Sequence, residues 1–483
     1  MKGDELVDLT IITLFIIIAI NYIYHLINRK PKQIVIIPGL QKSDPKFGNL
    51  LEIKNSGSLH QFLSDLHLKF GAVATFYWND QKIVSVCSND LFKSVQDLFD
   101  RPSLIFGNFH EFIGENCLQY ANGNEGQNRR KQYDKAFQHD MIIRYISTIE
   151  NVGKSNLEEW HGSKVTVDSI EHWAYIMAVK SILKACIIPE EQSPEYCDTI
   201  ITLYKSVFIG LEKKFVECKV LSDEEEIQFQ KDKNQFYSII REIINKRLDF
   251  LENSDLENEK LLLIDYIILY HRELNRNLIE NEVLIYLIGG FHTTGNALSW
   301  CIYYLAKHPK CQEKLFTEIS KRQIQLQNTS ECYKLILDLK YLKACIEETL
   351  RLSQLAPYAA RVSDEDRYLS NYEVPANTPI ILALGVSLKD EKIFNNPDQF
   401  NPERFVDSNF PSFAFVPFGF AGKRKCPGER FSYLELSIWL IQLVGKYRFT
   451  LTNPHQTVNK VYGLVTRMSE NVSVQFGERS DVL

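Results

Sequence analysis

One cysteine in the stretch PFGFAGKRKCPGERF, residues 417–431, stands among glycines, phenylalanines and basic residues. Gly419 and Gly422 precede it and let the backbone approach a neighbouring group closely. Pro427 follows it and is a favoured first residue of a helix, so we expect Cys426 at a helix N-terminus. Exposed amides and basic neighbours there lower the pKa of a thiol and favour the thiolate.

A thiolate in this position serves either as a nucleophile or as a ligand. A nucleophile needs a histidine base oriented by a third group, and no nearby sequence supplies one. A ligand role agrees better with the pattern, because a flat cofactor demands close backbone approach and Arg424 could pair with its carboxylates. A buried structural cysteine at a loop–helix junction is the alternative that the pattern alone leaves open.

A second group of polar residues interrupts an apolar helical pattern over 277–308, which Pro309 ends. The helix is apolar on nearly every face and is therefore expected to be buried all round. Weak helix formers occupy its middle: Gly289, Gly290, His292, Thr293, Thr294 and Gly295. Either a neighbouring helix packs on the glycines and the threonines bond back to carbonyls, or the backbone is locally opened toward a ligand.

A third group consists of charged residues near the C-terminal third of the chain. Glu348 and Arg351 lie three residues apart in a helical pattern over 341–353, hence on one face. Their apolar surroundings indicate burial, where both charges need further partners. Arg404, in the irregular segment 395–405, is a candidate third member of this charge network.

The elements that position these groups belong to a large, mildly acidic chain. It has 483 residues, 45% of them apolar, and a net charge of -6, which argues against a nucleic-acid partner. Its ten cysteines are widely spaced, so the sequence indicates neither a disulfide framework nor a structural zinc site. Short β-rich runs occur in 45–100 and mostly helical patterns follow, which predicts a mainly α fold with small β-sheets.

The N-terminus has the features of a membrane anchor. Residues 9–28 contain no Asp, Glu, Lys or Arg and are long enough to cross a bilayer of about 30 Å as a helix. Acidic residues precede this segment and basic ones follow it, which places the body in the cytosol. We therefore expect an anchor over 1–28, a Pro-containing tether over 29–44 and a single domain over 45–483. A cleaved signal peptide is the alternative, although no cleavage site follows.

Four motifs together resemble the cytochrome P450 superfamily. They are FGFAGKRKCPG around Cys426, GGFHTT in the central helix, EETLR and PERF, in the order and spacing of that family. The stretch 48–71 further resembles an animal orphan branch, cytochrome P450 family 20. The resemblance covers essentially the whole chain and implies the P450 fold, with one catalytic domain after an N-terminal transmembrane helix.

The resemblance also assigns roles to particular residues. It implies that Cys426 is the axial ligand of the iron of haem b, and that Thr293 helps to deliver protons to bound dioxygen, with His292 and Thr294 beside it. Glu348, Arg351 and Arg404 match a structural charge triad. The further cofactor contacts that it implies are Arg424, Arg361, Arg130, Phe418, Phe420, Gly422 and Gly428.

Three positions depart from the family pattern. Gly419 stands where the loop usually has phenylalanine, with Phe418 on one side and a second phenylalanine on the other. Gly126 replaces a tryptophan that normally contacts haem. His292 replaces the usual acid before the catalytic threonine. Because imidazole titrates near neutrality, His292 can relay protons in place of that acid. The alternatives are a slower or poorly coupled reaction, and ligation of the iron by His292 itself.

The resemblance predicts a haem-thiolate monooxygenase that inserts one oxygen atom of O2 into an apolar small molecule. Electrons would come from an NADPH-dependent cytochrome P450 reductase that meets a basic face including Lys423, Lys425 and Arg430. The location would be the endoplasmic reticulum membrane, single-pass, with a cytosolic catalytic domain. A haem-thiolate isomerase or dehydratase acting on a peroxide, and a non-catalytic haem-binding sensor or carrier, are the alternatives. Phe106, Phe109, Phe112 and Tyr358 would line the apolar cavity, or would instead fill the core.

Overall fold

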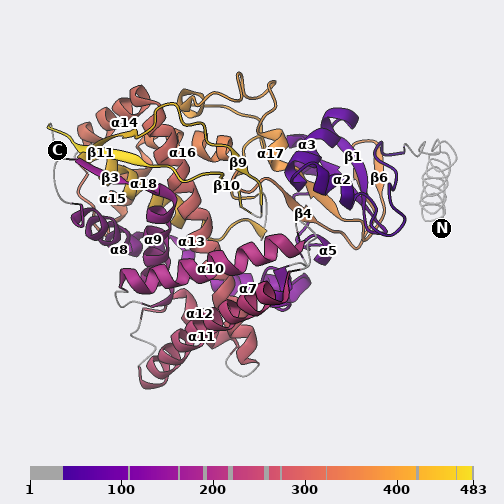
Figure 1. Cartoon of the computed structure of the whole chain (residues 1–483), viewed down its shortest axis with the longest axis horizontal. Coiled ribbons are helices and arrows are strands. Elements are labelled where there is room, and N and C mark those ends of the chain that lie inside the picture. The colour runs from indigo at the N-terminus through magenta and orange to yellow at the C-terminus, as the bar shows by residue number, and fades with distance from the viewer. Residues whose placement is uncertain are drawn as a thin grey trace, which may run out of the picture.

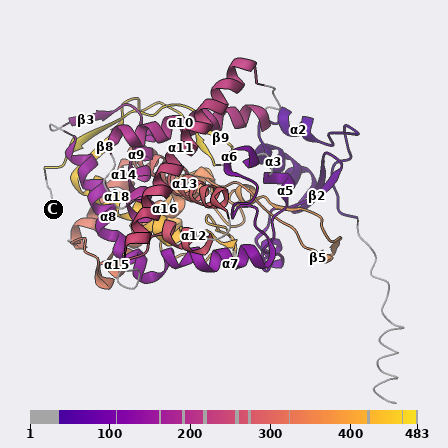
Figure 2. The same cartoon turned by 90° about the horizontal axis from the view of Figure 1, so that it is seen from below.

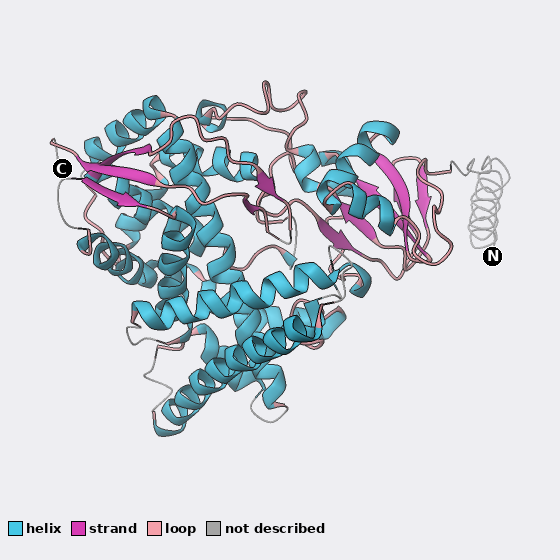
Figure 3. Cartoon of the chain, viewed as in Figure 1, coloured by secondary structure: helices cyan, strands magenta, loops and turns pink. Residues whose placement is uncertain are grey.

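The computed structural model describes residues 36–480 except 107–108, 161–163, 189–192, 216–220, 255–259, 272–274, 323, 420–423 and 464. Helices make up most of this part of the chain, and short strands lie at its two ends and, as the pair β9 and β10, near its middle (Figures 1 and 3). This architecture confirms the predicted mainly α fold with small β-sheets. The predicted anchor over 1–28 and most of the tether lie outside the described residues. None of the described helices is both long enough and apolar enough to cross a membrane.

The helical elements follow one another through almost the whole described chain. They are α2 (Leu50–Asn55), α3 (Leu59–Phe70), α4 (Asn89–Ser94), α5 (Ser103–Phe106), α6 (His110–Ile113), α7 (Gly123–Tyr133), η2 (Asp134–Phe137), α8 (His139–Glu158), α9 (Ile170–Ile182), η3 (Leu183–Ile187), α10 (Pro194–Phe215), α11 (Asp223–Asn253), α12 (Leu263–His271), α13 (Arg276–Lys307), α14 (Pro309–Arg322), α15 (Ser330–Leu337), α16 (Lys340–Ser353), α17 (Leu384–Ser387), η4 (Pro402–Phe405) and α18 (Glu429–Lys446).

The strands form four small sheets. They are β1 (Val73–Trp78), β2 (Gln81–Val86), β3 (Lys164–Val167), β4 (Ala359–Arg361), β5 (Arg367–Leu369), β6 (Tyr372–Val374), β7 (Ile380–Leu382), β8 (Tyr447–Leu451), β9 (Lys460–Val461), β10 (Arg467–Met468) and β11 (Val474–Glu478). The largest sheet has the order β1-β2-β7-β4, in which β2 and β7 are parallel and the other pairs antiparallel. It joins the indigo N-terminal region to segments far along the chain (Figure 1), and so brings Arg361 on β4 to the interior.

Helix α13 forms the centre of the helical part (Figure 2). Its N-cap is Asn275, whose side chain accepts a hydrogen bond from the N–H of Asn277, and it ends at Lys307, with His308 as the C-cap before Pro309. At 1.5 Å per residue it extends about 48 Å, enough to cross the domain. Helices α9, α11, α12, α16 and α18 all pack against it. The prediction of a long buried helix over 277–308 is therefore confirmed to within one residue at each end.

Two of the three glycines in α13 allow close helix packing. A Cβ on Gly290 would lie 2.6 Å from the side chain of Ile182, and one on Gly295 would collide with the ring of Tyr175. Both partners belong to α9, so these glycines let α9 approach α13 closely. Gly289 behaves differently, because a Cβ there would meet no atom within 4 Å.

Candidate active site

Cys426 lies in the loop that leads into α18. Its backbone N–H donates to the carbonyl of Phe418 at 3.0 Å. Between them Gly419 has φ 77°, a left-handed conformation that glycine adopts without steric cost. The Phe418 ring packs against Tyr433 with ring centroids 5.1 Å apart. Phe418 therefore supplies an aromatic ring to this loop, although Gly419 stands where the family usually has phenylalanine.

The remaining predicted loop contacts are only partly described. Gly428 is the N-cap of α18, and a Cβ on it would lie 3.9 Å from Cys426 Sγ. The helix therefore begins at Glu429, two residues later than the predicted start at Pro427. Phe420 and Gly422, like the basic residue Lys423, lie outside the described residues.

The Cys426 thiol is accessible and yet surrounded by protein. The residue is exposed, while burial among neighbouring groups raises its pKa, against a smaller lowering by the Gly428 N–H and Arg130. The residue is therefore reachable from outside, although its thiol has many protein neighbours. The expected lowering of its pKa is wrong for the protein chain alone, because lost hydration outweighs the helix terminus. A bound metal cation would reverse this balance.

Hydrogen bonds from Arg424 connect the cysteine loop to the segment before α7. Its guanidinium donates to the carbonyls of Phe99 at 3.0 Å and Leu118 at 2.8 Å, and to Asn122 Oδ1 at 3.1 Å. It also contacts the carbonyl of Ala121. Burial lowers the pKa of Arg424 to about 10, and Arg361 and Arg130 add to the effect. The structure therefore brings the three predicted propionate-binding arginines within electrostatic reach of one another.

The other two arginines reach this region from different elements. Arg130, near the end of α7, donates to the carbonyl of Lys425 at 2.8 Å and pairs with Asp134 at 2.9 Å. Arg361 is buried on β4 and donates to the carbonyl of Ala360 at 2.7 Å. Burial lowers its pKa to about 10.

A fourth arginine, Arg101, belongs to the same cluster and was not found from the sequence. Burial lowers its pKa well below the ordinary value, and Arg424, Arg361 and Arg130 lower it further. Its Nη1 donates to the carbonyl of Gln119 at 3.2 Å. Nothing in its local sequence, DRPS, marks it as part of a binding site.

This arginine cluster fits the propionates of haem. Four guanidinium groups, those of Arg101, Arg130, Arg361 and Arg424, repel one another in a poorly hydrated interior. A ligand with two carboxylates relieves that repulsion and forms charge-assisted hydrogen bonds. Arg130 also acts electrostatically on Cys426. Thiol and arginine cluster are therefore parts of one site.

Helix α13 presents an open face in the region of this site. Gly289 is exposed although most of α13 is buried, and the space beyond its Cα is unfilled. One turn later Thr293 is half-buried and donates through Oγ1 to the Gly289 carbonyl at 2.6 Å. Three residues before Gly289, Tyr286 lies within electrostatic reach of Cys426. A flat group could therefore lie against this face without displacing any side chain at Gly289.

The two other predicted catalytic residues turn away from that face. His292 is buried and its Nδ1 lies 2.7 Å from the hydroxyl of Tyr204 on α10. Burial lowers the pKa of His292 to about 3, with smaller contributions from Arg467 and Lys205. The expectation that His292 titrates near neutrality is therefore wrong, because the ring lies in a poorly hydrated interior.

Thr294 points toward α18 rather than back to its own helix. Its Oγ1 lies 3.3 Å from Ser432 Oγ and 3.3 Å from Glu435 Oε2. Glu435 is 1% exposed, and burial raises its pKa to about 8. The sequence analysis did not single out this carboxyl group, whose neutral form is favoured by burial and which lies behind the turn that carries Thr293.

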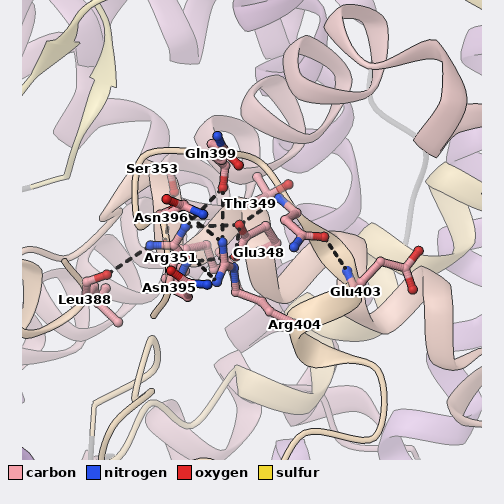
Figure 4. A network of polar contacts seen from close by, with 12 residues as sticks. Glu348, Thr349, Arg351, Ser353, Leu388, Asn395, Asn396, Gln399, Glu403 and Arg404 are labelled. Carbon is pink, nitrogen blue, oxygen red and sulfur yellow. Dashed lines mark hydrogen bonds and ion pairs between the residues drawn. The ribbon is translucent and has the colours of Figure 1, made fainter. Parts of the chain in front are cut away.

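Glu348, Arg351 and Arg404 form one buried network (Figure 4). Arg351 donates to both Glu348 oxygens at 2.8 and 3.0 Å, and Arg404 Nε donates to Glu348 Oε1 at 3.0 Å. The N–H of Asn401 also donates to Oε1, at 2.9 Å, and Arg351 Nη1 donates to the carbonyl of Leu388 at 2.9 Å. The network ties α16 to η4 and to the irregular segment between α17 and η4.

The missing tryptophan at position 126 has a packing explanation. A Cβ on Gly126 would collide with the carbonyl oxygen of Ala121 and lie 3.0 Å from the ring of Phe99. Ala121 and Phe99 are among the backbone groups that Arg424 contacts. The segment that binds Arg424 therefore occupies the space next to α7 where a side chain at position 126 would lie.

Several aromatic side chains cover the region between α6, α10 and α13. Phe112 packs against Tyr204 with ring centroids 6.5 Å apart, and Phe109 stacks on Phe208 at 6.2 Å. Tyr358 is half-buried, and burial raises its pKa to about 12. The exposed cysteine, the arginine cluster and the open face of α13 together supply what a haem-thiolate site needs: a thiolate ligand, cations for the propionates and room for a flat group.

Comparisons with known proteins agree with such a site. The profile of the family Cytochrome P450 matches residues 38–476. Cytochrome P450 20A1 of Bos taurus is 26% identical over 468 residues, which cover 95% of this chain and 96% of that protein. Cytochrome P450 20A1 of Homo sapiens is 25% identical with the same coverage. Beta-amyrin 11-oxidase of Glycyrrhiza uralensis is 25% identical and covers 90% of each chain.

The chain belongs to the cytochrome P450 family, because the profile match spans most of its length. It is a cytochrome P450 monooxygenase, and it resembles the family 20 proteins of mammals over 95% of its length. Haem iron and O2 are the cofactor and co-substrate that this family implies.

Proposed function

We propose that this protein inserts one oxygen atom of O2 into an apolar small molecule and uses electrons from an NADPH-dependent reductase. The observation that carries the proposal is the accessible thiol of Cys426, within electrostatic reach of both Arg130 and helix α13. Haem b, when bound, supplies the iron that activates O2 for this chemistry.

The residues of the chain have separable roles in this proposal. Cys426 binds the iron as thiolate, and the Arg101, Arg130, Arg361 and Arg424 cluster binds the propionates. The Gly289 face of α13 leaves room for the flat group, and the hydroxyl of Thr293 holds a proton beside it, bonded to the Gly289 carbonyl at 2.6 Å. The Glu348 network keeps the segments before the cysteine loop in place. Its ion pairs are 2.8 and 3.0 Å long and buried, so moving either arginine away would leave an uncompensated buried charge.

The proposed substrate is apolar because aromatic rings cover the region above α13. Phe112, Tyr204 and Phe208 come from different elements and pack together there. Burial of an apolar ligand against such rings contributes about 25 cal/mol per Å². Steroids, fatty acids, retinoids and foreign compounds all satisfy this chemistry.

The electron donor would meet the exposed basic side chains next to the cysteine loop. Lys425 and Arg430 are both exposed, and Lys425 also pairs with Glu429. Attraction between these basic side chains and an acidic face of the reductase would raise the association rate more than the affinity. We expect Lys425→Glu with Arg430→Glu to slow reduction by the reductase, most clearly at low salt. An unchanged rate would show that these are ordinary solvated charges.

The proposed location is the endoplasmic reticulum membrane, with residues 9–28 as a single-pass anchor and the catalytic domain in the cytosol. The sequence of this segment and the basic residues after it support the proposal. Asn328, in a potential glycosylation site, donates to Ser147 Oγ at 2.7 Å and accepts from Ser147 N–H at 2.8 Å. Glycans on Asn328 would overturn this orientation. Release of the protein into the soluble fraction without detergent would overturn the anchor.

The decisive experiment is the spectrum of the reduced, CO-bound protein beside Cys426→Ala. Cys311→Ala, which alters a half-buried cysteine on α14, is the matched control. We expect a red-shifted Soret band in the wild type and the control and its loss in Cys426→Ala. A normal unshifted band in the wild type would refute thiolate ligation. Turnover of a peroxide without NADPH would instead indicate the isomerase or dehydratase.

A further inference from the structure

A hydrogen bond joins the residue before Thr293 to a helix that covers the site. His292 Nδ1 on α13 lies 2.7 Å from the hydroxyl of Tyr204 on α10. Both side chains are buried, with exposures of 3% for His292 and 1% for Tyr204. The pair is therefore shielded from solvent, where a hydrogen bond between polar groups is held more strongly than at the surface.

Aromatic packing fixes the His292 ring on three sides. The ring centroid lies 5.1 Å from that of Tyr204, 5.3 Å from that of Phe208 and 6.0 Å from that of Tyr175. These neighbours come from α10 and α9. The backbone is held as well, since Asn296 Nδ2 donates to the His292 carbonyl at 2.9 Å.

The ring in this setting is neutral. Burial disfavours the charged form of His292, and the positive side chains that face it, Arg467 on β10 and Lys205 on α10, disfavour it further. No carboxylate is among the groups within hydrogen-bond reach of His292 that the described residues contain. His292 therefore cannot act as an acid that gains and loses a full charge, as the family's usual Asp or Glu would.

A neutral imidazole acts as a hydrogen-bonding group whose two nitrogens are unlike. One nitrogen carries the proton and the other accepts, and the partner of one nitrogen selects the state of the other. The hydroxyl of Tyr204 touches Nδ1 and so sets what Nε2 offers to its surroundings. Without that hydroxyl, the two tautomers of the ring would be free to mix.

We propose that Tyr204 is a positioning residue for the monooxygenase reaction, acting through Nδ1 of His292 to hold one tautomer and one ring orientation behind the turn of α13 that carries Thr293. The inference rests on the proposed function, because it concerns orderly proton supply to the same site. This explains how the chain can have histidine where the family has an acid. The hydrogen bond with the Tyr204 hydroxyl on α10, in place of a charged side chain, orders this turn of α13.

The test compares Tyr204→Phe with Tyr145→Phe. Both remove one hydroxyl from a buried ring, but Tyr145 on α8 donates to the carbonyl of Ala136 at 3.0 Å, away from α10. With reductase and NADPH but no substrate, O2 is reduced either by two electrons to H2O2 or by four electrons to water. We expect Tyr204→Phe to lower the ratio of water to H2O2 by about tenfold or more, below the full effect of losing a proton-transfer group. Tyr145→Phe is expected to leave the ratio unchanged.

A second readout is independent of turnover. The 15N and 1H shifts of the His292 ring, assigned by comparison with His292→Gln, report its tautomer. We expect a single tautomer in the wild type and Tyr145→Phe, and shifts toward a mixture in Tyr204→Phe. Identical ring shifts in all three proteins would overturn the inference, as would an unchanged water to H2O2 ratio. A wild type that consumes no NADPH would refute the proposed function instead, and the ring shifts would still decide the role of Tyr204.

Discussion

Removing the charge of Glu348 is expected to destabilise the fold severely. Glu348 and Arg351 have fully buried side chains, and Arg404 is 9% exposed. The substitution Glu348→Gln keeps the size of the side chain but leaves two guanidinium groups without their anion. Breaking a buried ion pair in this way costs about 3–5 kcal/mol. Since whole domains are stable by about 5–15 kcal/mol, the variant should lose about a fifth or more of its free energy of unfolding.

The assay is urea unfolding followed by circular dichroism, with and without haem. The matched control is Glu403→Gln, because Glu403 pairs with Lys314 and both side chains are about half exposed. Exposed pairs contribute about 0–1 kcal/mol, so the control should unfold almost as the wild type does. A loss below about 1 kcal/mol for Glu348→Gln, equal to that of the control, would refute the reasoning that this network is held by buried charge.

Three further predictions concern the site. Gly290→Ala should destabilise the protein by about 1–3 kcal/mol, the usual cost of overpacking, because its Cβ would lie 2.6 Å from Ile182. In the haem-free protein, Gly289→Ala should be neutral or stabilising, because nothing lies within 4 Å of its Cβ. Thermal unfolding of the two haem-free variants checks both. Glu435→Gln should unfold at a higher temperature than the wild type at pH 8 but not at pH 4. Burial raises the Glu435 pKa from 4.5 to about 8, so the folded chain keeps a proton that the unfolded chain releases, and wild-type stability falls as pH rises through this window. An equal difference in melting temperature at both pH values would contradict that assignment. Arg101→Leu should lose haem to apomyoglobin at least several times faster than the wild type, measured by the Soret band, because one of four guanidiniums that face the carboxylates is removed. An unchanged rate would place Arg101 outside the haem site.

Much of the fold could be predicted from local sequence. The pattern over 277–308 predicted α13, and the short β-rich runs within residues 45–100 predicted strands where β1 and β2 lie. Such elements follow from the spacing of apolar residues, which local backbone geometry imposes. The membrane anchor over 9–28 is a prediction of the same kind, based on length and the absence of charge.

The protonation states of the site residues were predicted wrongly for one physical reason. From the sequence, Cys426 was expected to have a lowered pKa because it lies near a helix terminus. His292 was expected to titrate near neutrality, as a free imidazole does. In the structure burial raises the pKa of Cys426 and lowers that of His292 to about 3. Desolvation depends on every neighbour in space, so it has no signature in the residues beside a group.

The sequence by itself determined which residues can perform the chemistry: one cysteine in a glycine-rich loop, threonines in a long helix, and a glutamate with two arginines. Motif spacing is sufficient for this, because each of these residues stands in a short local motif that can be read without knowing what packs against it. Only the tertiary structure decided which distant groups join them. Arg101, Tyr204 and Glu435 enter the site from segments far apart in the chain. Their roles arise from packing, which brings together polar groups that share no local pattern and removes the water that would otherwise satisfy them.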